Sequence, residues 1–135
     1  MQFEEFVGQV QHRARLASQG EAMRAICATL ETLGERLYDG EAAHVAAQLP
    51  PGIGAYLRLA KRQERFDIQE FFKRVAEREG AGVDVPDAAH HARTVIEVLQ
   101  EAVTPGQLRH LREQLPDDYA PLFEAGSQGD MNINR

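Results

Sequence analysis

The sequence predicts an all-α protein, folded as a compact helical bundle of two pseudo-symmetric four-helix repeats. Three observations lead to this prediction. Apolar residues recur at the three- and four-residue spacing of a helix, while the alternation typical of a half-buried strand is nearly absent. Capping signals stand before the apolar runs. The chain also repeats itself, because residues 22–57 match residues 88–123 without a gap at an offset of 66.

The apolar positions of the two copies agree throughout the match. In the first copy they are Ile26, Leu30, Leu33, Leu37, Val45, Leu49, Ile53 and Leu57, and in the second Ala92, Ile96, Leu99, Val103, Leu111, Leu115, Tyr119 and Phe123. Polar identities include Glu31/Glu97, Glu35/Glu101, His44/His110 and Gln48/Gln114. Before residue 22 the best offset is 65, which places Arg13 opposite Arg78. We therefore expect repeat one over about 3–62 and repeat two over about 67–125.

Each repeat is expected to contain four helices in the same order. The predicted ranges are about 3–16 and 68–80 for the first helix, 19–37 and 85–102 for the second, 40–48 and 105–114 for the short third, and 53–62 and 118–125 for the last. A proline break at Pro50 and at Pro116 separates the third helix from the fourth.

Residues suited to helix capping support these boundaries. Ser18, Asp67 and Asp84 each stand three residues before an acidic residue, in the pattern of a capping box. Thr104 precedes a proline, which is well tolerated in the first turn of a helix. In the first repeat, Asp39 is expected to cap the third helix.

The segment that joins the repeats does not have the composition of a flexible linker. Residues 58–66 contain no glycine, proline or serine, and Leu59 and Phe66 are available to the core. We therefore expect residues 1–125 to form a single domain. The last residues, 126–135, have no periodicity and are predicted to be a disordered tail.

Composition and charge narrow the class of protein. Of the 135 residues, 15 are basic and 21 acidic, and the net charge of -6 disfavours nucleic acid and anionic membranes as partners. The excess acid lies in residues 66–135, which hold 13 acidic and 7 basic residues. The single cysteine, Cys27, cannot form an internal disulfide, and no signal peptide or membrane span is apparent, so a cytoplasmic location is expected.

Several motifs together resemble a known family. They are the opening Phe-Glu-Glu-Phe over residues 3–6, the helix ends Gln48-Leu49-Pro50 and Gln114-Leu115-Pro116, and the closing run from Thr104 to Phe123. This pattern resembles the bacterial and archaeal proteins catalogued as domain of unknown function 2267. The resemblance covers residues 3 to about 125. It implies an all-helical, internally repeated, prokaryotic cytoplasmic protein and brings no reaction, cofactor or catalytic residue with it.

The histidines are the first candidates for a binding site. His44 and His110 occupy equivalent positions in the two repeats, one residue before a core position. The preferred interpretation is structural, with each imidazole bonded to a nearby backbone or carboxylate group. The alternative is a pair of symmetric metal ligands, or pH-sensitive contacts, across a pseudo-twofold axis.

His90 and His91 are adjacent, so on a regular helix they point about 100° apart and cannot both ligate one ion. We expect one of them at the margin of the core and the other on the surface. A metal site would need carboxylates or His12, His44 or His110 to converge from other helices.

Residues suited to catalysis are not arranged in a recognisable pattern. Glu31, Glu35, Glu97 and Glu101 are expected on solvated helix faces rather than as a general acid and base. Cys27 lies on an apolar stripe and is expected to be a buried structural thiol. No phosphate-binding loop is indicated. The sequence therefore predicts no enzyme and no cofactor.

One local excess of basic residues occurs over residues 58–74, and it could contact an acidic partner or nucleic acid. A helix-turn-helix over residues 39–61 has roughly the right size. However, the segment 53–60 that would be the recognition helix is mostly apolar, and its counterpart at 117–125 is acidic. DNA binding is therefore disfavoured.

These observations favour a non-enzymatic, cytoplasmic interaction or regulatory module whose partner is a protein, with the oligomeric state left open. The alternative is a small-ligand or metal-binding protein with a site at the interface between the repeats, where His44 and His110 would meet. A buried polar cluster at that interface would favour the alternative, whereas an apolar surface patch would favour the interaction module.

Overall fold

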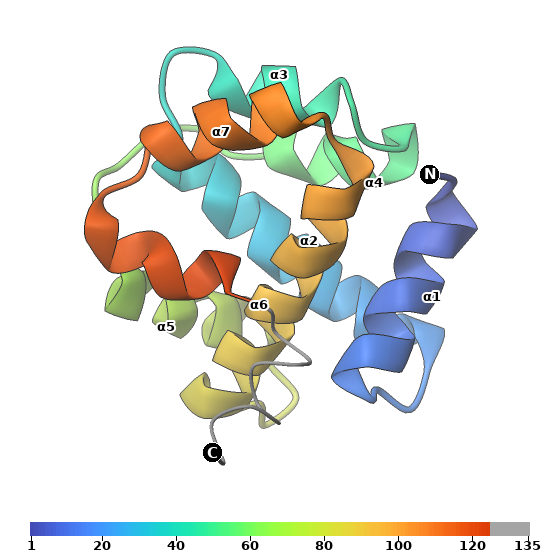
Figure 1. The fold of residues 1–135 in the computed structure, drawn as a ribbon. Helices are drawn as coiled ribbons and strands as arrows, with labels where there is room; N and C mark the ends of the chain where they lie inside the picture. The colour runs from blue at the N-terminus through green and yellow to red at the C-terminus, as the bar shows by residue number, and fades with distance from the viewer. Residues whose placement is uncertain (125–135) are drawn as a thin grey trace, which may run out of the picture.

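The computed structural model describes residues 1–124, which fold into helices joined by short loops (Figure 1). In chain order the elements are α1 (Phe3–Ala14), α2 (Gln19–Arg36), α3 (Glu41–Ala46), α4 (Pro51–Gly54), the 3-10 helix η1 (Ala55–Arg58), α5 (Ile68–Glu79), α6 (Val85–Ala102), α7 (Pro105–Glu113) and the 3-10 helix η2 (Asp117–Phe123). No strand occurs among residues 1–124. The all-α prediction is therefore confirmed. The predicted tail, 126–135, lies outside the described residues.

Four of the predicted caps are present at the helix starts. The side chains of Ser18, Asp67, Asp84 and Thr104 each accept a hydrogen bond from the backbone N–H three residues further on, at 2.9–3.2 Å. The prediction for Asp39 is wrong. The α3 helix begins after Gly40, whose φ of 77° lies in the left-handed region that glycine adopts freely, and no side chain caps it.

The two longest helices, α2 and α6, hold the centre of the core. In Figure 1, α6 crosses in front of α2, while α3 and α7 lie side by side at one end of the molecule. Both α1 and α5 pack against both long helices. The buried apolar side chains form one cluster, which includes Leu30 and Leu33 of α2 and Ile96 and Leu99 of α6. No helix within residues 1–124 combines the length and apolarity needed to cross a membrane.

A glycine allows η1 to approach α2 closely. A Cβ atom at Gly34 would collide with the backbone carbonyl of Leu57, so no larger residue fits without moving the main chain. This contact sets the position of the η1 segment over the C-terminal half of α2.

Two arginines connect helices that are distant in the sequence. Arg13 of α1 binds Glu101 of α6 with two hydrogen bonds of 2.8 Å. Arg78 of α5 binds Glu35 of α2 through bonds of 2.6 and 3.0 Å. Such paired contacts between a guanidinium and a carboxylate are directional as well as strong. The Arg13 guanidinium also holds the pKa of Glu101 below its ordinary value.

These contacts correct the prediction of solvated helix faces for Glu35 and Glu97, but not for Glu101, whose side chain is 50% exposed. Side-chain exposure is only 16% for Glu35 and 14% for Glu97. Glu97 lies 3.4 Å from Arg13, and Glu31 lies 3.9 Å from Arg78. Their polar positions on the helices face neighbouring helices, and the arginines compensate the partial loss of water.

The joint between η1 and α5 is irregular rather than helical. Helical structure ends at Arg58, and Leu59 is 52% exposed, so the prediction that Leu59 enters the core is wrong. Phe66 does pack against the core. The joint bonds to the end of α2 instead: Glu64 N–H donates to the carbonyl of Glu35, and Arg36 donates to the carbonyl of Phe66, both at 2.8 Å. Carbonyls left unpaired at a helix end attract such donors.

Candidate functional site

A buried carboxylate lies where α3 meets α7. Glu41, in the first turn of α3, has no exposed side-chain surface. One carboxylate oxygen lies 2.6 Å from His110 Nδ1, and the other accepts a 2.7 Å hydrogen bond from Gln107 Nε2. His44 Nδ1 is 3.9 Å from the first oxygen. A buried carboxylate requires such partners, because an unpaired charge is costly away from water.

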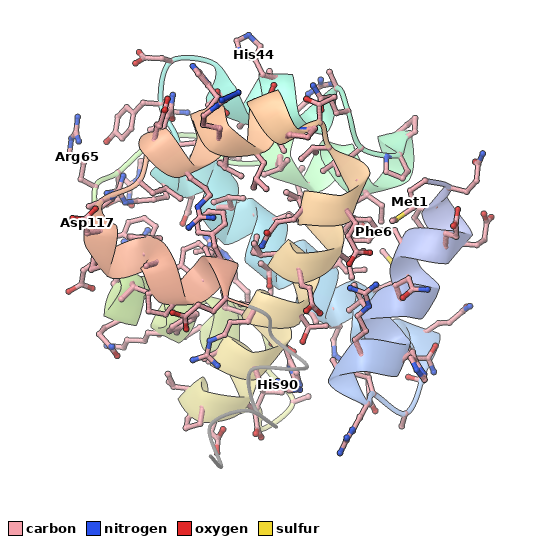
Figure 2. The ribbon with its side chains drawn as sticks, viewed as in Figure 1. Met1, Phe6, His44, Arg65, His90 and Asp117 are labelled. Carbon is pink, nitrogen blue, oxygen red and sulfur yellow. The ribbon has the colours of Figure 1, made fainter. Side chains whose placement is uncertain are left out.

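The structure therefore brings His44 and His110 to one carboxylate. Both imidazoles remain well exposed, with 64% and 59% of the side-chain surface accessible. Figure 2 shows His44 at the edge of the molecule, on α3. In the part of the chain that the structure describes, no group of three or more His, Cys, Asp or Glu side chains is arranged to hold a metal ion.

His90 and His91 do not join that cluster. They lie near the start of α6, while α7 follows its far end, and Figure 2 shows His90 well away from His44. Both are half-buried, so the prediction that one of them is a surface residue is wrong. The ring centroids are 5.9 Å apart. These neighbours therefore offer no shared site with the histidines of α3 and α7.

His91 instead pairs with a glutamate at the end of α5. Its Nδ1 atom lies 2.9 and 3.1 Å from the two carboxylate oxygens of Glu79, whose side chain is 3% exposed. The hydrogen bond to Glu79 raises the pKa of His91, against the effect of burial, and the charges of Asp87 and Glu21 add to the rise. This arrangement favours a protonated imidazole facing a buried carboxylate.

A shallow apolar groove runs along the outer side of α7. It has a volume of about 420 Å³ and is lined by Pro105, Leu108, Arg109, Arg112 and Glu113. A smaller depression of about 190 Å³ adjoins it at Arg112 and extends over η2. The Arg112 guanidinium lies 5.0 Å from the ring centroid of Phe123, a cation–π distance. Among the described residues, no carboxylate is ion-paired with Arg109 or Arg112.

Some of the basic side chains of segment 58–74 are engaged in contacts within the fold. Arg74 binds Glu35, Glu64 and Glu70 at 2.8–3.1 Å. Arg65 lies over the ring of Tyr38, 5.0 Å from its centroid, and Figure 2 places it at the edge of the molecule.

Cys27 is half-buried on α2, and burial raises the pKa of its thiol. A raised pKa disfavours the thiolate, which is the reactive form. The side chain is less deeply buried than the sequence pattern predicts.

Sequence reasoning missed the two buried carboxylates, Glu41 and Glu79. Glu41 looks like an ordinary acidic residue of a first helical turn, and Glu79 precedes a glycine-rich loop. The sequence held one indication for Glu41. Its counterpart 66 residues on, Gln107, is also polar, and both lie beside the core positions of the short third helix.

The His91–Glu79 pair predicts a specific pH dependence of stability. Because folding raises the pKa of His91, its contribution is fully present below about pH 6.5, the pKa of an unfolded histidine, and is lost as pH rises through the folded-state pKa. Glu79→Gln should therefore cost on the order of 1–3 kcal/mol at pH 6 and less at higher pH. Urea denaturation of both proteins at several pH values measures the difference.

The matched control is Glu4→Gln, which changes an exposed carboxylate of α1 and should leave the pH profile unaltered. The account would be contradicted if the difference in the free energy of unfolding between wild type and Glu79→Gln were the same at pH 6 and at higher pH.

The comparisons with known proteins give one assignment. A search of curated proteins finds no match to the chain. The model of a family described as "Uncharacterized conserved protein (DUF2267)" matches residues 3–122, which is most of the chain and nearly all of the described helices. The protein belongs to the DUF2267 family.

Proposed function

We propose that this protein is a non-enzymatic interaction or regulatory module, which binds a segment of a partner protein along α7. The observation that carries this proposal is the shallow groove of about 420 Å³ on that helix. Pro105 and Leu108 contribute apolar surface to it, and exposed apolar patches of this kind are typical of protein contact sites.

The charges beside the groove indicate the chemistry of the partner. Arg109 and Arg112 are exposed and line the groove, and among the described residues that line it Glu113 is the only acid. Arginine is favoured at protein interfaces because its planar guanidinium can bind a carboxylate with two hydrogen bonds. An amphipathic segment with aspartate or glutamate beside leucine, isoleucine or phenylalanine fits this surface. Nucleic acid fits the overall charge of -6 less well.

We further propose that residues 3–62 and 67–124 are two copies of one unit, related by a pseudo-twofold axis and packed as one domain. The order of the helices supports this. The α5 helix begins 65 residues after the start of α1, and α6 begins 66 residues after the start of α2. Contacts exchanged between the halves support it as well. Gln48 Oε1 accepts from Thr104 N–H, and Gln114 Oε1 accepts from Tyr38 N–H.

A prokaryotic cytoplasmic location is part of the same proposal. It is supported by the single free cysteine, which suits a reducing compartment, and by the resemblance of the helix-end motifs to bacterial and archaeal proteins.

Selection from a displayed library of random peptides tests the interaction. Peptides enriched on the wild-type protein should combine acidic with large apolar residues. Their affinity, measured by fluorescence anisotropy, should fall at least about tenfold in Leu108→Glu, a loss of about 1.4 kcal/mol. Binding should also weaken as salt is added, since exposed charges are screened.

The matched control is Leu59→Glu, because Leu59 is an exposed leucine outside the groove. If Leu108→Glu fails to fold, Arg109→Glu and Arg112→Glu test the same surface through exposed residues. Failure to enrich any peptide, or peptides that bind all of these variants as tightly as the wild type, would refute the proposal.

A second candidate function is metal or small-ligand binding at the contact between α3 and α7. The observation that favours it is the approach of His44 and His110 to the buried Glu41. Imidazole and carboxylate groups are common zinc ligands. A bound ion would have to replace the direct 2.6 Å contact between His110 Nδ1 and Glu41, with His44 Nδ1, now 3.9 Å from the same oxygen, as a further ligand.

The effect of added zinc on the melting temperature distinguishes the two candidate functions. If Glu41 and its neighbours are structural, adding zinc should leave the melting temperature nearly unchanged. A site occupied at a hundred times its dissociation constant would instead add about 2.7 kcal/mol, which is several degrees in a domain of this size. A rise of that size, abolished by His44→Ala or His110→Ala but retained in His12→Ala, would favour the second candidate.

A further inference from the structure

Exposed basic side chains gather on the segment that joins the two halves of the chain. This segment, the basic joint, comprises residues 58–65 and begins at the last residue of η1. Its basic residues, all of them exposed, are Arg58, Lys61, Arg62 and Arg65. Figure 2 shows Arg65 at the edge of the molecule. The basic joint is thus a positive patch on a protein whose net charge is -6.

The one acid of the basic joint is engaged by a cation from outside it. Glu64 Oε1 lies 3.0 Å from Arg74 Nη1 of α5, and the nearer cation within the joint, Arg62 Nε, is 3.9 Å away. Its charge is therefore compensated mainly by α5. Among the described residues, Arg58, Lys61 and Arg65 have no ion-pair partner.

Acids that flank the basic joint do not neutralise it either. Asp39 follows Tyr38, on whose ring Arg65 lies, and Asp67 stands just before α5. Asp67 accepts a hydrogen bond from the Glu70 N–H as the cap of that helix. Among the described residues, neither aspartate forms an ion pair with the joint. Positive charge therefore remains available on this surface.

Contacts with the rest of the fold hold the main chain of the basic joint in place. The Glu64 N–H donates to the carbonyl of Glu35 at 2.8 Å. The Arg65 guanidinium lies 5.0 Å from the ring centroid of Tyr38. A binding surface on a fixed main chain loses less conformational entropy when a partner binds.

The scaffold does not need these cations. The joint is attached to α2 through backbone groups and to α5 through Glu64, and Lys61 and Arg62 take no part in either attachment. Residues 124–131, which stand 66 positions later, contain two acids and no basic residue. The positive charge is therefore a feature of one half of the chain alone.

The chemistry and spacing of the cations favour a chain of carboxylates as the partner. Three of the four are arginines, whose planar guanidinium binds a carboxylate with two hydrogen bonds. They are distributed along the whole segment, so they match a series of negative charges better than a single small anion. A run of aspartate and glutamate residues in an extended protein segment supplies such a series.

Larger anionic surfaces fit the basic joint less well. Outside the joint the chain holds 11 basic and 20 acidic residues. A nucleic acid duplex or a bilayer extends beyond the joint and would also approach exposed acids such as Asp39 and Asp67, whereas charges more than about 8 Å from a short segment are screened. Within the joint, Leu59 is the single large apolar side chain that is exposed, which offers little surface for membrane insertion.

We propose that the basic joint binds an acidic segment of a partner protein, whose carboxylates pair with the four exposed cations. None of these cations lines the α7 groove, so the joint is a second interaction surface. It differs from the groove in requiring no apolar side chain from its partner. This binding goes beyond the proposed function and does not depend on it.

A fluorescein-labelled peptide of alternating glutamate and serine, with one glutamate for each cation, is the probe. Fluorescence anisotropy with the full-length protein at about 50 mM salt should show saturable binding, which weakens as salt is added. The dissociation constant should rise about tenfold in the double variant Lys61→Gln/Arg62→Gln. Arg62 is 80% exposed and its one ion pair is the 3.9 Å contact with Glu64, so the variant should keep the wild-type melting temperature.

The matched control is Arg15→Gln/Arg24→Gln, which removes the same charge from two exposed arginines outside the joint and should bind the peptide like the wild type. Arg109→Gln/Arg112→Gln should also bind normally, because the peptide has no apolar residue for the α7 groove. The proposal is overturned if the peptide does not bind saturably, or if either of these variants loses as much affinity as Lys61→Gln/Arg62→Gln. Tighter binding to a DNA duplex, or to vesicles of phosphatidylserine and phosphatidylcholine, would also overturn it.

Discussion

Two arginine–glutamate contacts connect opposite halves of the chain and give direction to the packing of the helices. Arg13 of α1 binds Glu101 of α6, and Arg78 of α5 binds Glu35 of α2, each through two hydrogen bonds. Apolar burial supplies most of the stability of such a core, but it is not directional. The paired guanidinium bonds add direction to that packing. With α2 and α6 placed in this way, the short helices α3 and α7 that follow them meet at one end, where Glu41, His110 and the α7 groove lie.

The candidate sites occur where the chemistry of the two halves differs. The α7 helix bears Arg109 and Arg112 beside its groove, whereas α3 has Ala43 and Ala46 at the matching positions. Glu41 accepts a hydrogen bond from Gln107, its counterpart 66 residues on, so these two equivalent positions carry one carboxylate and one amide. The pair Glu79–His91 stands where the first half has two alanines. Under the proposed duplication, features shared by both copies maintain the scaffold, and features of one copy alone are the ones free to acquire a separate role.

Local features of the fold could be predicted from the sequence, and features that depend on distant contacts could not. Helix starts follow from capping residues such as Ser18 and Asp84, because a cap acts within three residues of itself. The partners of Glu35 depend on how α5 crosses α2, which the helical pattern does not reveal. The end of helical structure at Arg58 was missed for the same reason, since the joint is held by bonds to the end of α2. At the candidate site, the sequence singled out His44 and His110, but the burial of Glu41 between them depends on how α3 meets α7, which the helical pattern does not reveal.

A double-mutant cycle on Arg78→Gln and Glu35→Gln tests most directly whether the contacts between the halves hold the fold together. The free energy of unfolding is measured by urea denaturation for the wild type, the two single variants and the double variant. The account predicts a coupling energy of about 0.5–3 kcal/mol, the range seen for residues in one ion-pair network, with a smaller value at high salt. The same cycle on Arg62 and Glu64, which are 3.9 Å apart and more exposed, should give a coupling near zero. Strict additivity at Arg78 and Glu35 would contradict the account, because the two side chains would then contribute independently of their contact.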